Sequence, residues 1–145
     1  MNREEIVQKA FEYFNGGFHC AEAVSKAIVE VYGKGPNSEI PQVASAFGGG
    51  AVKTFDGTCG ALTGGLVAIG CLYGRMKPGD EETKKEVFQL AQDLGKRFVA
   101  EFGASNCNSV LELLGPQENM NKCKQLSGTV AGMLSDILEK KTKAS

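Results

Sequence analysis

The stretch from Gly57 to Gly74 contains no charged side chain, and this run of eighteen residues restricts the fold more than any other part of the chain. Its length reaches the lower limit for a helix that crosses a membrane. Six of its residues are glycine, however, and polar groups on Thr58, Thr63 and Tyr73 interrupt the apolar surface. We therefore expect no membrane insertion and predict a central helix that neighbouring helices surround on every side.

Three glycines of this central helix predict unusually close packing. Gly60, Gly64 and Gly65 would allow another backbone to approach, as small residues do where helices pack together. Glycine inside a helix costs roughly 1 kcal/mol relative to alanine, so close packing must offset several such penalties.

The apolar residues of the rest of the chain recur mainly at helical spacing. We predict further helices over residues 2–14, 19–32, 40–47, 80–102, 109–114 and 117–139. Ser38 and Asp80 are expected to cap two of them, and the helix at 80–102 is expected to be the longest. Ala51–Phe55 is the one weak candidate for a strand, and residues 140–145 are expected to form a frayed tail. The predicted fold is all-α: a compact multi-helix bundle around the glycine-rich central helix, with residues 1–145 as a single domain.

The charge and the N-terminal segment bear on partners and compartment. Sixteen basic residues against 17 acidic ones give a net charge of -1, which provides no broad electrostatic reason to bind nucleic acid. The N-terminal segment is amphipathic and lacks the pattern of a secretory signal, so a cytoplasmic location is expected. Structural disulfides are uncommon there, and cysteines are more often ligands or redox groups.

Three of the five cysteines fall where helices are predicted to begin. Cys20 follows a glycine pair, Cys59 follows Thr58 as a candidate N-cap, and Cys107 follows Ser105-Asn106. The unpaired N–H groups of a helix N-terminus favour thiolate over thiol, and they can lower a cysteine pKa from about 8.5 to roughly 3.5–7.5. We therefore predict activated cysteines at these three positions.

The remaining cysteines and the single histidine are assigned different roles. Cys123 lies on the apolar stripe of the last predicted helix and would face the interior, where the other three cysteines could meet it. Cys71 follows Cys59 by twelve residues, which is about 120° of helical rotation, so it is predicted to be a core residue. His19 is expected to cap a helix or pack locally in preference to acting as a base for Cys20.

The segment Cys59-Gly60-Ala61-Leu62-Thr63-Gly64, with Cys20 upstream and Cys107 and Cys123 downstream, resembles the C_GCAxxG_C_C family, whose members are expected to be redox-active. The resemblance implies that these four are the family cysteines and that Cys71 is an extra one. A similar domain accompanies the haem-binding part of split-Soret cytochromes, where an iron–sulfur centre has been suggested. The resemblance thus implies redox chemistry and is compatible with either thiols or a cluster.

Three functions are consistent with these residues. In the first, Cys20, Cys59, Cys107 and Cys123 carry out thiol–disulfide exchange or electron transfer as a thiol-dependent oxidoreductase, and all three pairings of the four stay open. In the second, the same cysteines bind an iron–sulfur cluster or a zinc ion. In the third, the bundle binds a partner and its cysteines are small buried apolar residues. A redox partner protein is expected in preference to a metabolite, and a homo-oligomer is compatible with this chain.

Overall fold

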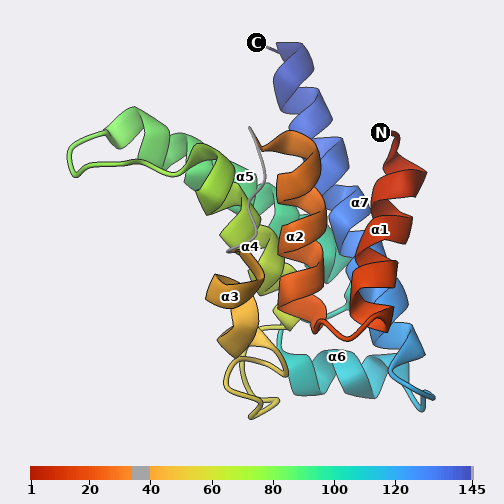
Figure 1. The fold of residues 1–145 in the computed structure, drawn as a ribbon. Helices are drawn as coiled ribbons and strands as arrows, with labels where there is room; N and C mark the ends of the chain where they lie inside the picture. The colour runs from red at the N-terminus through yellow and green to blue at the C-terminus, as the bar shows by residue number, and fades with distance from the viewer. Residues whose placement is uncertain (34–39, 145) are drawn as a thin grey trace.

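The computed structural model describes residues 1–33 and 40–144, so the predicted cap Ser38 lies outside the described residues. Within them the chain forms seven α-helices, one short 3-10 helix and no strand, which confirms the predicted all-α fold (Figure 1). The elements are α1 (Arg3–Asn15), α2 (Cys20–Tyr32), α3 (Ile40–Ala44), η1 (Ser45–Phe47), α4 (Gly60–Tyr73), α5 (Glu81–Phe102), α6 (Cys107–Leu114) and α7 (Asn121–Ala144).

Helix α2 occupies the middle of the bundle. It contacts α1, α3, α4 and α7, while α1 packs chiefly on α7 and α5 packs on α4. Figure 1 shows α1, α2 and α7 side by side, with α6 lying across the lower end of the bundle where α2 begins. This arrangement brings the starts of several helices to the same end of the molecule.

Polar side chains fix where three of the helices begin. The side chains of Asn2, Asp80 and Asn106 accept hydrogen bonds from backbone N–H groups in the first turns of α1, α5 and α6. In α6, the N–H of Ser109 donates to Asn106 Oδ1 over 2.9 Å. Such caps satisfy N–H groups that have no partner within the helix. Asp80 therefore caps α5 as predicted.

The first turns of α4 lie directly against α2, as the glycine pattern predicted. A methyl group added at Gly64 would lie 2.8 Å from Ala21 Cα and closer still to the Ala21 carbonyl oxygen. One added at Gly60 would collide with the sulfur of Cys20. At Gly65 the neighbour is instead the side chain of Leu94 on α5. The α2 backbone therefore requires glycine at position 64, and the sulfur of Cys20 requires it at position 60.

The prediction that neighbours surround α4 on every side is wrong. Leu66 is 38% exposed, and Gly70 and Cys71 are also exposed. Helices α2, α3, α5 and α7 contact α4, whereas Leu66 and Gly70, four residues apart on the same face, are exposed. Cys71 lies beside Gly70 near this face, so its assignment to the core is also wrong. No helix in the described part of the chain is both long and apolar enough to cross a membrane.

The C-terminal helix is longer than predicted. Helix α7 has 24 residues against 22 in α5, and it continues through Ala144, so the expected frayed tail is helical over residues 140–144. Lys141 helps to hold the tail in the helix, because its ammonium group pairs with Glu86 and lies 4.8 Å from the ring centroid of Tyr73. At its other end α7 begins at Asn121, four residues after the predicted start.

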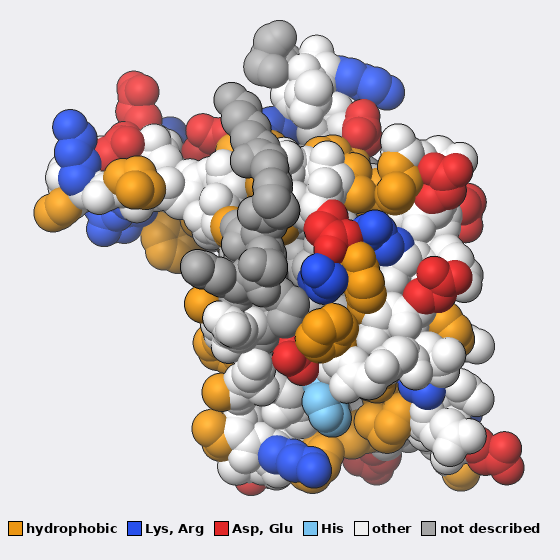
Figure 2. All heavy atoms as spheres, viewed as in Figure 1, with side chains coloured by type: hydrophobic (Ala, Val, Ile, Leu, Met, Phe, Trp, Pro, Cys, Tyr) orange, Lys and Arg blue, Asp and Glu red, His pale blue; other side chains and the backbone are white. Residues whose placement is uncertain are grey.

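Other boundaries shift by less. Helix α6 begins at Cys107, two residues before the predicted start, and the predicted short helix at 40–47 divides into α3 and η1. On the face drawn in Figure 2, acidic and basic side chains are interspersed and do not gather into one large patch of a single sign.

The contact between α2 and α4 predicts opposite effects for two glycine-to-alanine substitutions within α4. Gly64→Ala should lower the free energy of unfolding by about 2–3 kcal/mol, because the new methyl group overlaps the α2 backbone. Gly70→Ala should raise it by about 0.5–1 kcal/mol, because its methyl group meets nothing within 4 Å and alanine favours the helix. Urea denaturation followed by circular dichroism measures both. Equal effects of the two substitutions would contradict the close contact.

Candidate functional site

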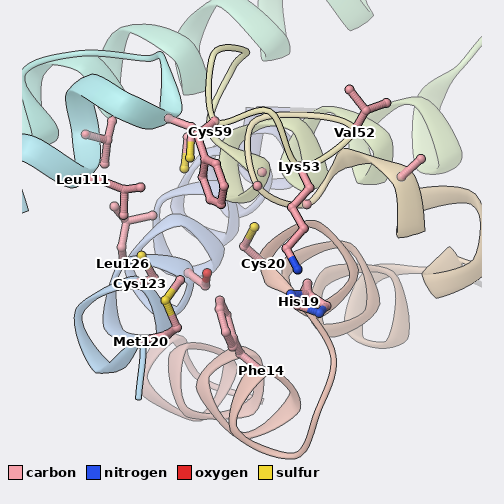
Figure 3. Close-up of a pocket in the computed structure, with 18 of the residues that line it drawn as sticks. Phe14, His19, Cys20, Val52, Lys53, Cys59, Leu111, Met120, Cys123 and Leu126 are labelled. Carbon is pink, nitrogen blue, oxygen red and sulfur yellow. The ribbon is translucent and has the colours of Figure 1, made fainter. Parts of the chain in front are cut away.

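The four cysteines singled out by the sequence line one cavity of about 460 Å³. Cys20, Cys59, Cys107 and Cys123 reach it from α2, α4, α6 and α7, at or close to the start of each helix. Figure 3 shows the labelled sulfur atoms of Cys20, Cys59 and Cys123 around the same space. Cys71 does not line this cavity. The fold therefore brings together four thiols that are far apart in the sequence.

The sulfur of Cys20 packs against the first turn of α4. The sulfur lies against Gly60, the residue directly after Cys59, so any side chain at position 60 would overlap it. The thiols of Cys20 and Cys59 are also close enough to influence each other electrostatically, since a negative charge on Cys20 raises the pKa of Cys59. These two cysteines are consequently neighbours across the contact between α2 and α4.

Backbone pairing places Cys107 on the same side as Cys59. Thr58 and Asn106 form an isolated antiparallel bridge, in which the N–H of Cys59 donates to Ser105 O over 2.7 Å and that of Cys107 donates to Gly57 O over 2.8 Å. Each cysteine follows a bridged residue, so both side chains project from the face opposite to Thr58 and Asn106. Thr58 is therefore a bridging residue, and the N-cap position of α4 belongs to Cys59 itself, contrary to prediction.

Burial raises the pKa of the cysteines at the helix starts, which is the reverse of the prediction. Removal from water is the largest influence on Cys59 and raises its pKa to about 12, although the N–H groups of Ala61 and Leu62 act in the lowering direction. Burial likewise raises the pKa of Cys20 and of Cys107. The prediction counted the helix N-termini and omitted the larger cost of placing a thiolate in a poorly hydrated site. At neutral pH these three are therefore thiols.

Cys123 is held by a side chain that the sequence did not single out. Gln117 Nε2 donates to the sulfur of Cys123 over 3.3 Å, while Gln117 Oε1 accepts from the N–H of Cys123 over 3.0 Å. The amide thus fixes both the backbone and the thiol in the first turn of α7. The only signal in the sequence was an amide side chain six residues before Cys123, and this signal is weak.

The loop between η1 and α4 covers the cavity with a left-handed turn. Positive φ angles run from Gly49 through Lys53, with values of 62°, 70°, 62°, 43° and 57°, so the proposed strand at residues 51–55 is wrong. Left-handed backbone costs roughly 1–2 kcal/mol for each residue with a side chain. Hydrogen bonds such as that from Phe55 N–H to Gly49 O, 2.8 Å, hold the turn. Gly50 allows it to lie against Cys107, where a methyl group would be 2.8 Å from Cys107 Cβ.

His19 occupies the N-cap position of α2, in keeping with the local role predicted for it. Glu22 Oε1 accepts a hydrogen bond from the His19 N–H over 3.1 Å, and the imidazole lies 6.4 Å from the Phe14 ring, centroid to centroid. Both rings line the cavity. In the view of Figure 3 the side chain of Lys53 points toward His19.

The cavity lining also includes three polar residues that sequence reasoning missed, Ser45, Lys53 and Ser127. Ser127 lies four residues after Cys123, so helical spacing from that cysteine could have pointed to it.

The donor set has the right chemistry for a metal but lacks the spacing. Four thiols suit zinc or an iron–sulfur cluster. Within residues 1–33 and 40–144, however, no group of three or more His, Cys, Asp or Glu side chains is arranged to hold a metal ion.

Comparison with known proteins agrees with the cysteine pattern. A family model described as "Putative redox-active protein (C_GCAxxG_C_C)" matches residues 18–137, a range that includes all four cavity cysteines. No curated protein and no solved structure matches the chain.

The raised pKa of Cys59 predicts a distinctive order of alkylation. With a pKa of about 12, only roughly one Cys59 in 10,000 is a thiolate at pH 8. Iodoacetamide should therefore modify the exposed Cys71 first, and modification of Cys59 should accelerate as the pH rises from 8 to 11. Mass spectrometry of tryptic peptides measures both rates. Modification of Cys59 at pH 7 as fast as that of Cys71 would show that the helix N-terminus outweighs burial.

Proposed function

This chain belongs to the C_GCAxxG_C_C family, and we propose that it is a thiol-dependent redox protein whose buried cysteines convert reversibly between dithiol and disulfide. The observation that carries the proposal is the gathering of four thiols from four separate segments around one cavity. Cysteines that served only as small apolar residues would have no reason to share one cavity.

We assign the primary dithiol to Cys20 and Cys59. The sulfur of Cys20 packs on Gly60, the residue next to Cys59, and the two thiols influence each other electrostatically. Disulfide formation requires Cα atoms within about 7 Å, a separation that direct contact between the first turns of α2 and α4 favours. Cys20 also influences Cys107 and Cys123 electrostatically, so the contact of its sulfur with Gly60 is what distinguishes Cys59 as its partner. Cys107 and Cys123 are left as a second pair or as resolving thiols.

The backbone around this pair stabilises a thiolate as it forms. The N–H groups of Gly49 and Ala21 act on the sulfur of Cys20, and those of Ala61 and Leu62 act on that of Cys59. In the resting protein, burial outweighs these donors and keeps both thiols protonated. When one thiol loses its proton to attack a disulfide, the donors are already oriented toward the developing negative charge. The reaction then follows ordinary exchange, through a mixed disulfide that the second thiol resolves.

Substitution of individual cysteines tests the assignment. Cys20→Ser and Cys59→Ser should each slow oxidation of the protein by diamide at least tenfold, because each removes one member of the pair. Cys71→Ser serves as the matched control, since Cys71 lies outside the cavity, and it should oxidise at the wild-type rate. Thiol counts before and after dithiothreitol treatment measure the conversion. Wild-type rates in both Cys20→Ser and Cys59→Ser would contradict the pair.

Iron–sulfur binding is a second candidate, favoured by the number of thiols at the cavity and by the N–H groups near two of them. Such hydrogen bonds to sulfur tune the potentials of clusters. We expect protein purified without oxygen, from cells supplied with iron, to contain far less than one cluster per chain. Iron and acid-labile sulfide assays measure this. Stoichiometric iron with matching sulfide, lost in a folded Cys59→Ser variant, would replace the dithiol proposal with a cluster.

A further inference from the structure

Ser127 presents an unsatisfied hydroxyl group at the cavity. The residue lines the cavity and is 0% exposed, and its Oγ has no hydrogen-bond partner among residues 1–33 and 40–144. Buried polar atoms are almost always hydrogen-bonded, because an unpaired one costs free energy that water would otherwise have supplied. Since Ser127 lies four residues beyond Cys123 on α7, this hydroxyl is available close to the thiols.

The charge of the cavity lining is one-sided. Lys53 is its charged residue, and its side chain points toward His19 in the view of Figure 3, while neither Asp nor Glu occurs among the described residues that line the cavity. The rest of the wall is largely apolar and includes Phe14, Phe55 and Leu126. Lys53 is an exposed residue of the loop that covers the cavity, whereas Ser127 is fully buried, so the two polar groups mark the rim and the interior.

These features define the class of ligand. A cavity of about 460 Å³ falls in the range of small-molecule sites, which combine apolar walls with a few placed polar groups. An anionic group suits Lys53 at the rim, an aliphatic body suits the walls, and a group that accepts a hydrogen bond from Ser127 suits the interior. Because thiols also line the cavity, the ligand should carry a group that can exchange with a thiol.

We propose that the cavity binds a small aliphatic molecule with a carboxylate at one end and a disulfide at the other, and that this disulfide is the exchange partner of Cys20 and Cys59. The inference rests on the proposed dithiol function and names its substrate. The carboxylate lies at Lys53, and the Ser127 hydroxyl donates to the ligand sulfur that leaves.

The exchange balances without a further reactant. One protein thiol gives up its proton and attacks a ligand sulfur; the ligand S–S bond breaks, a mixed disulfide forms, and the leaving sulfur takes up a proton. The second protein thiol then attacks the mixed disulfide, which forms the Cys20–Cys59 bond and frees the other ligand sulfur as a thiol. The protein dithiol loses two electrons and two protons, and the ligand disulfide gains both. The reverse reaction reduces the protein.

Three small molecules test the carboxylate and the disulfide of the proposed ligand separately. Lipoate carries both the carboxylate and the disulfide, lipoamide replaces the carboxylate with a neutral amide, and octanoate retains the carboxylate without sulfur. We expect calorimetry on the full chain to give the tightest binding for lipoate and binding about fivefold weaker or more for each of the other two. Lipoate should also oxidise two protein thiols, which thiol counts record separately.

Two substitutions test the assigned contacts. Lys53→Met should weaken lipoate binding about fivefold and leave lipoamide binding unchanged, while Lys77→Met, at an exposed lysine outside the cavity lining, is the matched control. Ser127→Ala should weaken lipoate binding about threefold and yet raise the melting temperature of the ligand-free protein, because it removes an unsatisfied buried hydroxyl. A purely structural serine would lower that melting temperature.

The outcomes distinguish this inference from the function on which it rests. Lipoate binding that depends on Lys53 and Ser127, with oxidation of two thiols, supports both. Failure of lipoate to bind, while diamide still oxidises Cys20 and Cys59, overturns the ligand and leaves the dithiol. Lipoate binding with no disulfide formed by any oxidant overturns the exchange step and the dithiol together.

Discussion

The arrangement of the cysteines depends on one steric constraint, the contact between the first turns of α2 and α4. That contact exists because Gly60 and Gly64 have no side chain where Ala21 and the sulfur of Cys20 lie. The glycines of α4 carry a cost in helix stability, and the close approach of two helix starts is what compensates it. Through the bridge between Thr58 and Asn106, the start of α4 also fixes the start of α6, and with it Cys107. The packing of α4 on α2 therefore also determines where Cys20, Cys59 and Cys107 lie.

Burial gives the site a chemistry different from that of an exposed reactive cysteine. The helix N-termini supply N–H donors to Cys20 and Cys59, yet removal from water dominates and keeps their pKa above the usual range. A protonated, enclosed thiol is a poor nucleophile toward oxidants in solution. In the proposed exchange, selectivity comes from the cavity, because a disulfide that enters it meets donors oriented toward the charge that exchange creates. The left-handed turn over the cavity places backbone strain beside the same cysteines, where functional sites commonly store it.

Periodicity was sufficient to predict the helices, and the glycines of α4 correctly indicated backbone contact, because both signals are local or depend on size alone. Three of the cavity cysteines followed from their positions near helix starts, and Cys123 followed from its position on the apolar stripe of the last predicted helix. Cys71 was misplaced because an apolar helix does not reveal which of its faces lacks a neighbour. The predicted pKa directions were wrong because they depend on how much water the fold removes. The strand expected at residues 51–55 was wrong because the hydrogen bonds of the turn at Gly49–Lys53 reach back to η1. Lys53 and Ser127 became site residues only once the loop and α7 were placed around the cavity.

If glycine-mediated packing makes Cys20 and Cys59 a specific thiol pair, the two should be joined in oxidised wild-type protein, and mapping of its disulfide shows whether they are. Protein oxidised to the loss of two thiols would be blocked, digested without reduction and analysed for cross-linked peptides by mass spectrometry. We expect one dominant cross-link, between the peptides that contain Cys20 and Cys59. A dominant link that involves Cys71, or a mixture in which the Cys20–Cys59 link is minor, would contradict it.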